Sequence, residues 1–86
     1  MIKIWDDVMW EHYLYWQDKD KKTMVKINKL IKDIERNGVN NGIGKPERLK
    51  HLKSWSREID EKNRLTYDVI DNKLHLYTCR GHYDDK

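Results

Sequence analysis

The apolar residues in the first half of the chain recur with the spacing of two amphipathic helices. The first helix is predicted to begin at an N-cap Asp6 and to end near Asp18. The second is predicted over about residues 20–37, where apolar residues follow an i, i+3, i+4, i+7 rhythm. Before both helices, residues 1–5 alternate in the manner of a short strand.

The second half of the chain is strand-like and is separated from the helices by a loop. Asn37-Gly38 ends the second helix, because glycine accepts the left-handed C-cap conformation at low cost. Residues 38–46 hold three of the four glycines and the only proline, which predicts a loop. The segments that follow are a short strand-like ERLKH (47–51), a strand WSREI (55–59), a turn (60–63), a strand RLTYDVI (64–70), a tight turn DN (71–72) and a strand KLHLYTC (73–79).

This order of elements predicts the fold class. Two helices followed by a meander of strands favour an α+β fold with a mostly antiparallel sheet and both N-terminal helices packed on one face. Residues 1–86 are too few for two hydrophobic cores, so we expect a single domain.

Charge adds a hint of an anionic partner. Lys and Arg number 18 against 15 Asp and Glu, a net charge of +3, which is compatible with nucleic-acid binding but also with an ordinary solvated surface. The excess is concentrated in residues 45–57, where five cations accompany the single acid Glu47.

Several classes of protein are disfavoured by composition. Cys79 is the only cysteine, so an internal disulfide is impossible and a structural zinc site is not expected. No apolar run approaches the roughly 20 residues that a membrane helix needs, and the N-terminus lacks a secretory signal. We therefore expect a cytoplasmic protein without a metal or cofactor.

Chemistry-bearing residues lie in segments that a meander brings to one side of the sheet. Together they offer a carboxylate, Glu47, an arginine, Arg64, and a histidine, His82. Cleavage of RNA by its own 2′-hydroxyl needs a base, an acid and a cation for the charge that builds on phosphorus. Glu47 suits the base, His82 the acid and Arg64 the stabiliser, since its planar fork matches phosphate oxygens.

Each of these residues also has a plain structural interpretation. A lone Glu47 in a basic loop is more commonly a solvated ion-pair partner, and Arg64 alone would be an exposed strand arginine. His82 alone would be a surface histidine. Arg57 shares a face with Trp55 and Ile59 and could simply stack on an aromatic ring.

The segments as a set resemble the YoeB toxins, a branch of the RelE superfamily of bacterial type II toxin–antitoxin systems. The resemblance covers nearly the whole chain and rests on YLYWQ (13–17), KINKLIKDI (26–34), GKPERLKH (44–51), WSR (55–57), NRLTY (63–67) and the final CR-HY. It implies a RelE-like domain that acts as an mRNA interferase, cutting mRNA in the A site of the 70S ribosome and inhibiting translation. It also implies neutralisation by a YefM-like antitoxin and a tendency to homodimerise.

The resemblance also implies roles for individual residues. It makes Glu47 the general base, Arg64 the phosphate-stabilising arginine and His82 the general acid. It further implies that Tyr83 positions substrate or the histidine, that Lys50 contributes positive potential, and, as a weaker carry-over, that Arg57 binds or positions substrate.

This chain departs from the family pattern at three places. Members commonly read WSRR where this chain has Glu58, and GKPEP where it has Arg48. Here Asp84, Asp85 and Lys86 follow the His-Tyr pair.

Two rival functions are a ParE-like inhibitor of DNA gyrase and a basic RNA-binding accessory protein. Intact GKPE and HY motifs argue against both.

Overall fold

The computed structural model describes residues 1–50 and 54–81. Its elements follow the predicted order: β1 (Ile2–Trp5), α1 (Asp7–Lys19), α2 (Lys21–Asn37), β2 (Glu47–Arg48), β3 (Trp55–Glu58), β4 (Arg64–Ile70) and β5 (Lys73–Thr78). The five strands form one sheet in the order β1-β5-β4-β3-β2. Among these described strands, β1 and β5 pair in parallel and the other neighbours pair antiparallel. The prediction of a mostly antiparallel α+β fold is confirmed.

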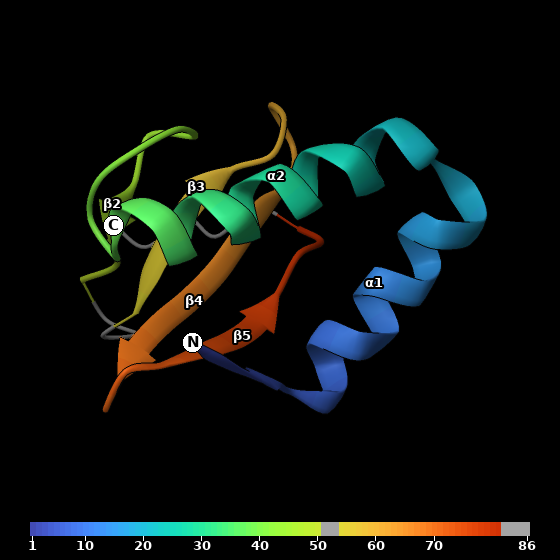
Figure 1. Ribbon diagram of the computed structural model, residues 1–86. Coiled ribbons are helices and arrows are strands. Elements are labelled where there is room, and N and C mark those ends of the chain that lie inside the picture. Colours follow the sequence, from blue (N-terminus) through green and yellow to red (C-terminus); the bar gives the residue numbers. More distant parts are fainter. Residues whose placement is uncertain (51–53, 82–86) are drawn as a thin grey trace.

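Both helices contribute to a core on one side of the sheet. Figure 1 shows α2 crossing that face, with α1 beside the end of β5. The buried cluster joins both helices to the sheet through Met9, Trp16, Ile27, Leu30, Ile31, Ile34, Ile59, Leu65, Tyr67, Leu74, Leu76 and Cys79. Because strand side chains alternate between faces, the other face of β2, β3 and β4 is left for polar residues.

One residue joins the two helices. Asp20 ends α1 with its backbone N–H bonded to the Trp16 carbonyl, and it caps α2 with its side chain. Its carboxylate accepts hydrogen bonds from the backbone N–H groups of Lys22 and Thr23 at 3.1 and 3.3 Å, and from the Thr23 hydroxyl at 2.9 Å. The hydrogen bonds from Thr23 lower the pKa of Asp20. This cap turns the chain sharply between the helices.

The hairpin between β4 and β5 sets the register of the central strands. Asp71 and Asn72 have φ values of 51° and 60°, which is the left-handed pair required by a two-residue type I′ turn. Further along, the register shifts, so that Tyr67 pairs with Leu76 but Thr66 pairs with Thr78. The extra residue in β5 is a bulge, and bulges re-aim the strand that follows them.

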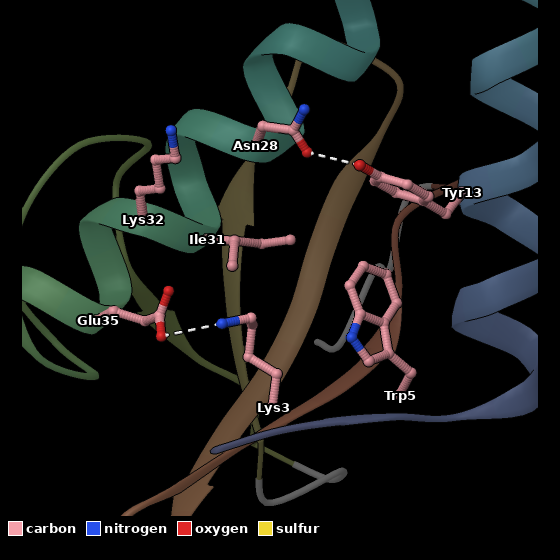
Figure 2. Close-up of a pocket in the computed structure, with 7 residues that line it drawn as sticks. All are labelled: Lys3, Trp5, Tyr13, Asn28, Ile31, Lys32 and Glu35. Carbon is pink, nitrogen blue, oxygen red and sulfur yellow. Dashed lines mark hydrogen bonds and ion pairs between the residues drawn. The ribbon is translucent and has the colours of Figure 1, made fainter. Parts of the chain in front are cut away.

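β1 contacts both helices, through the ion pair of Lys3 with α2 and the packing of the Trp5 ring against Tyr13 of α1. Figure 2 shows a pocket where Lys3 and Trp5 of β1 point toward the two helices. Lys3 pairs with Glu35 at 3.2 Å, and the Tyr13 hydroxyl donates to Asn28 at 2.8 Å. Four polar side chains of the pocket are therefore paired with one another, and the pairs connect β1 with α2 and α1 with α2.

Among the described residues, neither helix combines the length and apolarity needed to cross a bilayer.

Candidate active site on the open face of the sheet

Strand pairing gathers a polar set on the face of the sheet opposite the helices, where Ser56 and Thr66 are buried and Glu47 is exposed. We call this the open face and define it by Glu47, Ser56, Glu58, Arg64 and Thr66. The pairs are Glu47 with Ser56, Ser56 with Thr66, and Glu58 with Arg64. Directly opposed residues in antiparallel strands share a face, so β2, β3 and β4 present these side chains together.

Arg64 lies at the centre of the open face. Its Nη1 donates to the Ser56 hydroxyl at 3.1 Å and lies 3.6 Å from the Glu47 carboxylate. Its Nη2 lies 4.0 Å from the carboxylate of Glu58. The guanidinium is therefore held between two carboxylates and a hydroxyl, with only 15% of its side chain exposed.

Glu47 is the most exposed side chain of the residues around Arg64. It occupies the edge strand β2, and 64% of its side chain is exposed. Its 3.6 Å contact with Arg64 fixes its direction without enclosing it. The structure thus brings together two of the three residues expected to do the chemistry.

Arg57 lies on the opposite side of the sheet. Its side chain is completely buried and lies 5.6 Å from the centre of the Tyr67 ring. Its Nε donates to the Tyr67 hydroxyl at 2.8 Å, and the guanidinium also binds Asp33 and the carbonyl oxygens of Gly38, Asn41 and Ile43. All five N–H donors are used within the chain. The described structure therefore leaves the Arg57 side chain no free donor for substrate, and of the two expected roles, binding or positioning, only positioning stays a prediction.

The role of Arg57 is to anchor the loop that leads into Glu47. Three carbonyl oxygens of residues 38–43 accept hydrogen bonds from its guanidinium. Burial alone would raise the pKa of Asp33, but hydrogen bonds from Arg57, from the Ile43 N–H and from Asn37 outweigh burial and lower it. The loop also approaches closely, since a Cβ on Gly42 would lie 1.8 Å from the Asp33 carboxylate. Glycine at this position is a packing requirement.

Gly81 lies beside Arg64 at the start of β4. The Arg64 backbone N–H donates to the Gly81 carbonyl at 2.9 Å, and the Gly81 N–H donates to the Asn63 side chain at 2.9 Å. His82 and Tyr83, the next two residues in the sequence, lie outside the described residues, as do Asp84 and Asp85. Lys50 is exposed in the turn after β2.

Cys79 is a buried thiol and not a candidate nucleophile. Burial raises the pKa of the Cys79 thiol to about 12, so it stays protonated at neutral pH and is a poor nucleophile. Among residues 1–50 and 54–81, no three His, Cys, Asp or Glu side chains group together as metal ligands would.

A family model matches residues 5–83 of the chain, and it describes a YoeB-like toxin of bacterial type II toxin-antitoxin systems. The chain belongs to the YoeB family. Toxin YoeB of Escherichia coli strain K12 is 51% identical over 85 residues, which cover 96% of this chain and 100% of that protein. Toxin YoeB of Synechocystis is 46% identical over 79 residues, covering 90% and 91% of the two chains.

Solved structures agree with this placement. A YoeB dimer from Staphylococcus aureus superimposes with a TM-score of 0.91 at 42% identity, covering 96% of this chain and 98% of that one. YoeB in a heterotetrameric YoeB–YefM complex from the same organism gives 0.88 at 42% identity, with the same coverage. YafQ from E. coli, at 16% identity and a TM-score of 0.77 over 93% of this chain and 91% of that one, shares the fold alone.

Sequence reasoning missed two features of this YoeB-family site. Ser56 is a partner of Arg64, which only the β3–β4 register reveals. Glu58 faces both Arg64 at 4.0 Å and Lys45 at 3.8 Å. Strand alternation places Glu58 two residues from Ser56 and on the same face, and that is the signal that could have found both.

Proposed function

We propose that this YoeB-family toxin is a ribosome-dependent endoribonuclease that cleaves mRNA in the A site without a metal. The observation that carries the proposal is the geometry on the open face: the Arg64 guanidinium lies 3.6 Å from an exposed Glu47 carboxylate. The same arginine holds, through its backbone, the segment that continues into His82. A base, a cation and an acid are thereby drawn from β2, β4 and the C-terminal segment.

The reaction uses the nucleophile that RNA itself carries. Glu47 takes the proton of a 2′-hydroxyl as that oxygen attacks the adjacent phosphorus. The bond from phosphorus to the 5′ oxygen breaks, and His82 donates a proton to the departing oxygen. Arg64 stabilises the negative charge on the phosphoryl oxygens. The products are a 2′,3′-cyclic phosphate and a free 5′-hydroxyl.

Dependence on the ribosome follows from how open the site is. Glu47 is 64% exposed at a sheet edge, so the site by itself encloses little of a substrate. Positioning must therefore supply much of the catalysis. A ribosome that holds mRNA in line for attack would provide it, while Lys50 and Tyr83 assist binding and positioning of the substrate.

The partners proposed for this chain follow its relatives. YoeB of S. aureus is found in complexes with YefM and as a dimer. We infer a YefM-like antitoxin, an acidic segment that folds when it binds the basic toxin. A homodimer fits a small core together with exposed Val8, Trp10 and Leu14 on α1.

The function is tested by adding purified toxin to a translation extract and mapping mRNA ends by primer extension. We expect codon-phased cuts on translated mRNA and no cuts on the same mRNA without ribosomes. An mRNA carrying a 2′-deoxynucleotide at the cut position should stay intact, because the attacking hydroxyl is missing. Intact mRNA together with blocked DNA gyrase would instead favour a ParE-like toxin. Binding to ribosomes without cutting would favour an accessory protein.

Glu58→Gln is expected to raise cleavage activity. Glu58 lies 4.0 Å from Arg64 and 3.8 Å from Lys45, so its charge offsets two cations that would otherwise face the RNA phosphates. At least a third of its side chain is exposed, where solvent screens charge, so the gain should be modest: about 2–5-fold in kcat/KM, or about 0.4–1 kcal/mol. Glu61→Gln, the same charge change in an exposed turn, is the control. An unchanged or lower kcat/KM would contradict this role for Glu58.

A further inference from the structure

The residues just before the proposed general acid are held by helix α1. Trp16 Nε1 donates to the Cys79 carbonyl at 2.9 Å, and the Cys79 N–H donates to His12 Nδ1 at 3.1 Å. The guanidinium of Arg80 lies 3.6 Å from the centre of the Tyr15 ring. Cys79 and Arg80 are thus bound by side chains of α1. The next residue, Gly81, is bound by the Asn63 side chain and the Arg64 backbone.

We call this the α1 clamp and define it as His12, Tyr15 and Trp16 acting on Cys79 and Arg80. It forms where the regular pairing of β5 has ended, so the sheet ladder does not hold these residues. The clamp binds both the N–H and the C=O of Cys79, which fixes the orientation of that peptide. The bulge in β5 precedes it and re-aims the chain.

Gly81 completes the path toward the open face. Its φ is +106°, a conformation that L side chains rarely adopt, although a Cβ there would meet nothing within 4 Å. The requirement is therefore conformational and not a matter of space. With its carbonyl on the Arg64 N–H, Gly81 lies at the start of β4, and His82 follows after one peptide bond.

We propose that His12, Tyr15 and Trp16 are positioning residues for RNA cleavage, because they fix the segment that delivers the general acid to the site. The inference rests on the proposed function. None of the three residues needs to touch substrate. Their effect is on where the chain enters His82, and so on the fraction of molecules whose acid meets the departing oxygen.

The chemistry of His12 suits this task. To accept the Cys79 N–H, Nδ1 must be unprotonated. Burial and the positive charge of Arg80 both lower the pKa of His12, which keeps the ring neutral at physiological pH.

The test compares two substitutions at His12. His12→Asn keeps an acceptor oxygen near the position of Nδ1, whereas His12→Ala removes it. Single-turnover cleavage is measured at saturating toxin on programmed ribosomes, and binding is measured on ribosomes carrying an mRNA with a 2′-deoxynucleotide at the cut position. We expect His12→Ala to lower the rate about 10- to 100-fold with little change in binding, and His12→Asn to restore most of it.

Tyr13→Phe is the matched control on the same helix. It removes the hydrogen bond to Asn28 without touching the clamp, and it should leave the rate unchanged. Amide hydrogen exchange of Cys79 reports the clamp directly, since that N–H donates to His12. It should exchange faster in His12→Ala and remain protected in Tyr13→Phe.

A double-mutant cycle with His82→Ala decides whether the clamp acts through the acid. If it does, His12→Ala should cost little further rate once His82 is gone. An equal loss in both backgrounds, or a wild-type rate in His12→Ala, would overturn the proposal. Failure of the proposed function is recognised separately, because the wild-type toxin itself would then leave the mRNA intact.

Discussion

Glu47→Gln is expected to abolish most mRNA cleavage while ribosome binding persists. Glutamine keeps the shape of the side chain but cannot take a proton from the 2′-hydroxyl. Loss of a general base costs about 10²–10⁴-fold in rate. Arg64 would still be held by Ser56 and Glu58, so the cation on the open face should stay in place. The measurement is the single-turnover cleavage rate at saturating toxin, alongside binding to ribosomes that carry an uncleavable mRNA.

Glu11→Gln is the control for the change in net charge, because Glu11 is exposed on α1. It should cleave at the wild-type rate. Urea unfolding of Glu47→Gln should match that of the wild type within about 0.5 kcal/mol, since an exposed ion pair contributes little to stability. A Glu47→Gln toxin that cuts at nearly the wild-type rate would rule out Glu47 as the base.

The element order and part of the site could be predicted because they depend on local patterns. Helical spacing located α1 and α2, and Asp71-Asn72 announced the hairpin between β4 and β5. A meander of neighbouring strands brings Glu47 and Arg64 together on short-range pairing alone. Their 3.6 Å approach needs nothing from distant parts of the chain except the anchored loop before β2.

Two other features escaped sequence reasoning because they depend on long-range contacts, namely the burial of Arg57 and the contact of His12 with Cys79. The face of Arg57 was predictable, since Arg57 lies two residues after Trp55 and shares its face, but its burial depends on a carboxylate in α2, 24 residues away. Without knowledge of the Asp33 carboxylate, a charged residue on an apolar face is naturally interpreted as a stacking or substrate-binding group. The contact between His12 and Cys79 spans 67 residues, and no local pattern signals it.

Two arginines from neighbouring strands have different places in the structure, one beside the proposed base and one in the core. Arg57 of β3 pairs with Leu65, and Arg64 of β4 pairs with Glu58, the residue after Arg57. The two arginine side chains therefore point to opposite faces of the sheet. Arg64 remains near the surface beside Glu47. Arg57 gives all its donors to the protein, so its substitution should be felt in folding.

Arg57→Ala is expected to destabilise the toxin by about 3–5 kcal/mol, the range seen when one partner of a buried ion pair is removed. The substitution strands the Asp33 carboxylate and removes the donors bound by three loop carbonyl oxygens and the Tyr67 hydroxyl. Urea unfolding at pH 7 gives the free energy of unfolding for both proteins. Arg57→Lys should recover only part of the loss, because an ammonium cannot match five donors in a planar fork.

Arg36→Ala, which removes an exposed arginine from α2, is the control and should change stability by less than about 0.5 kcal/mol. Lowering the pH supplies a second check. The folded-state pKa of Asp33 lies below its ordinary value, so its ionised form stabilises the fold above the unfolded pKa of about 3.9 and less so as the pH falls through the folded value. The difference between wild type and Arg57→Ala should therefore narrow below about pH 4. A loss smaller than about 1 kcal/mol at pH 7 would mean that the loop before Glu47 does not depend on Arg57.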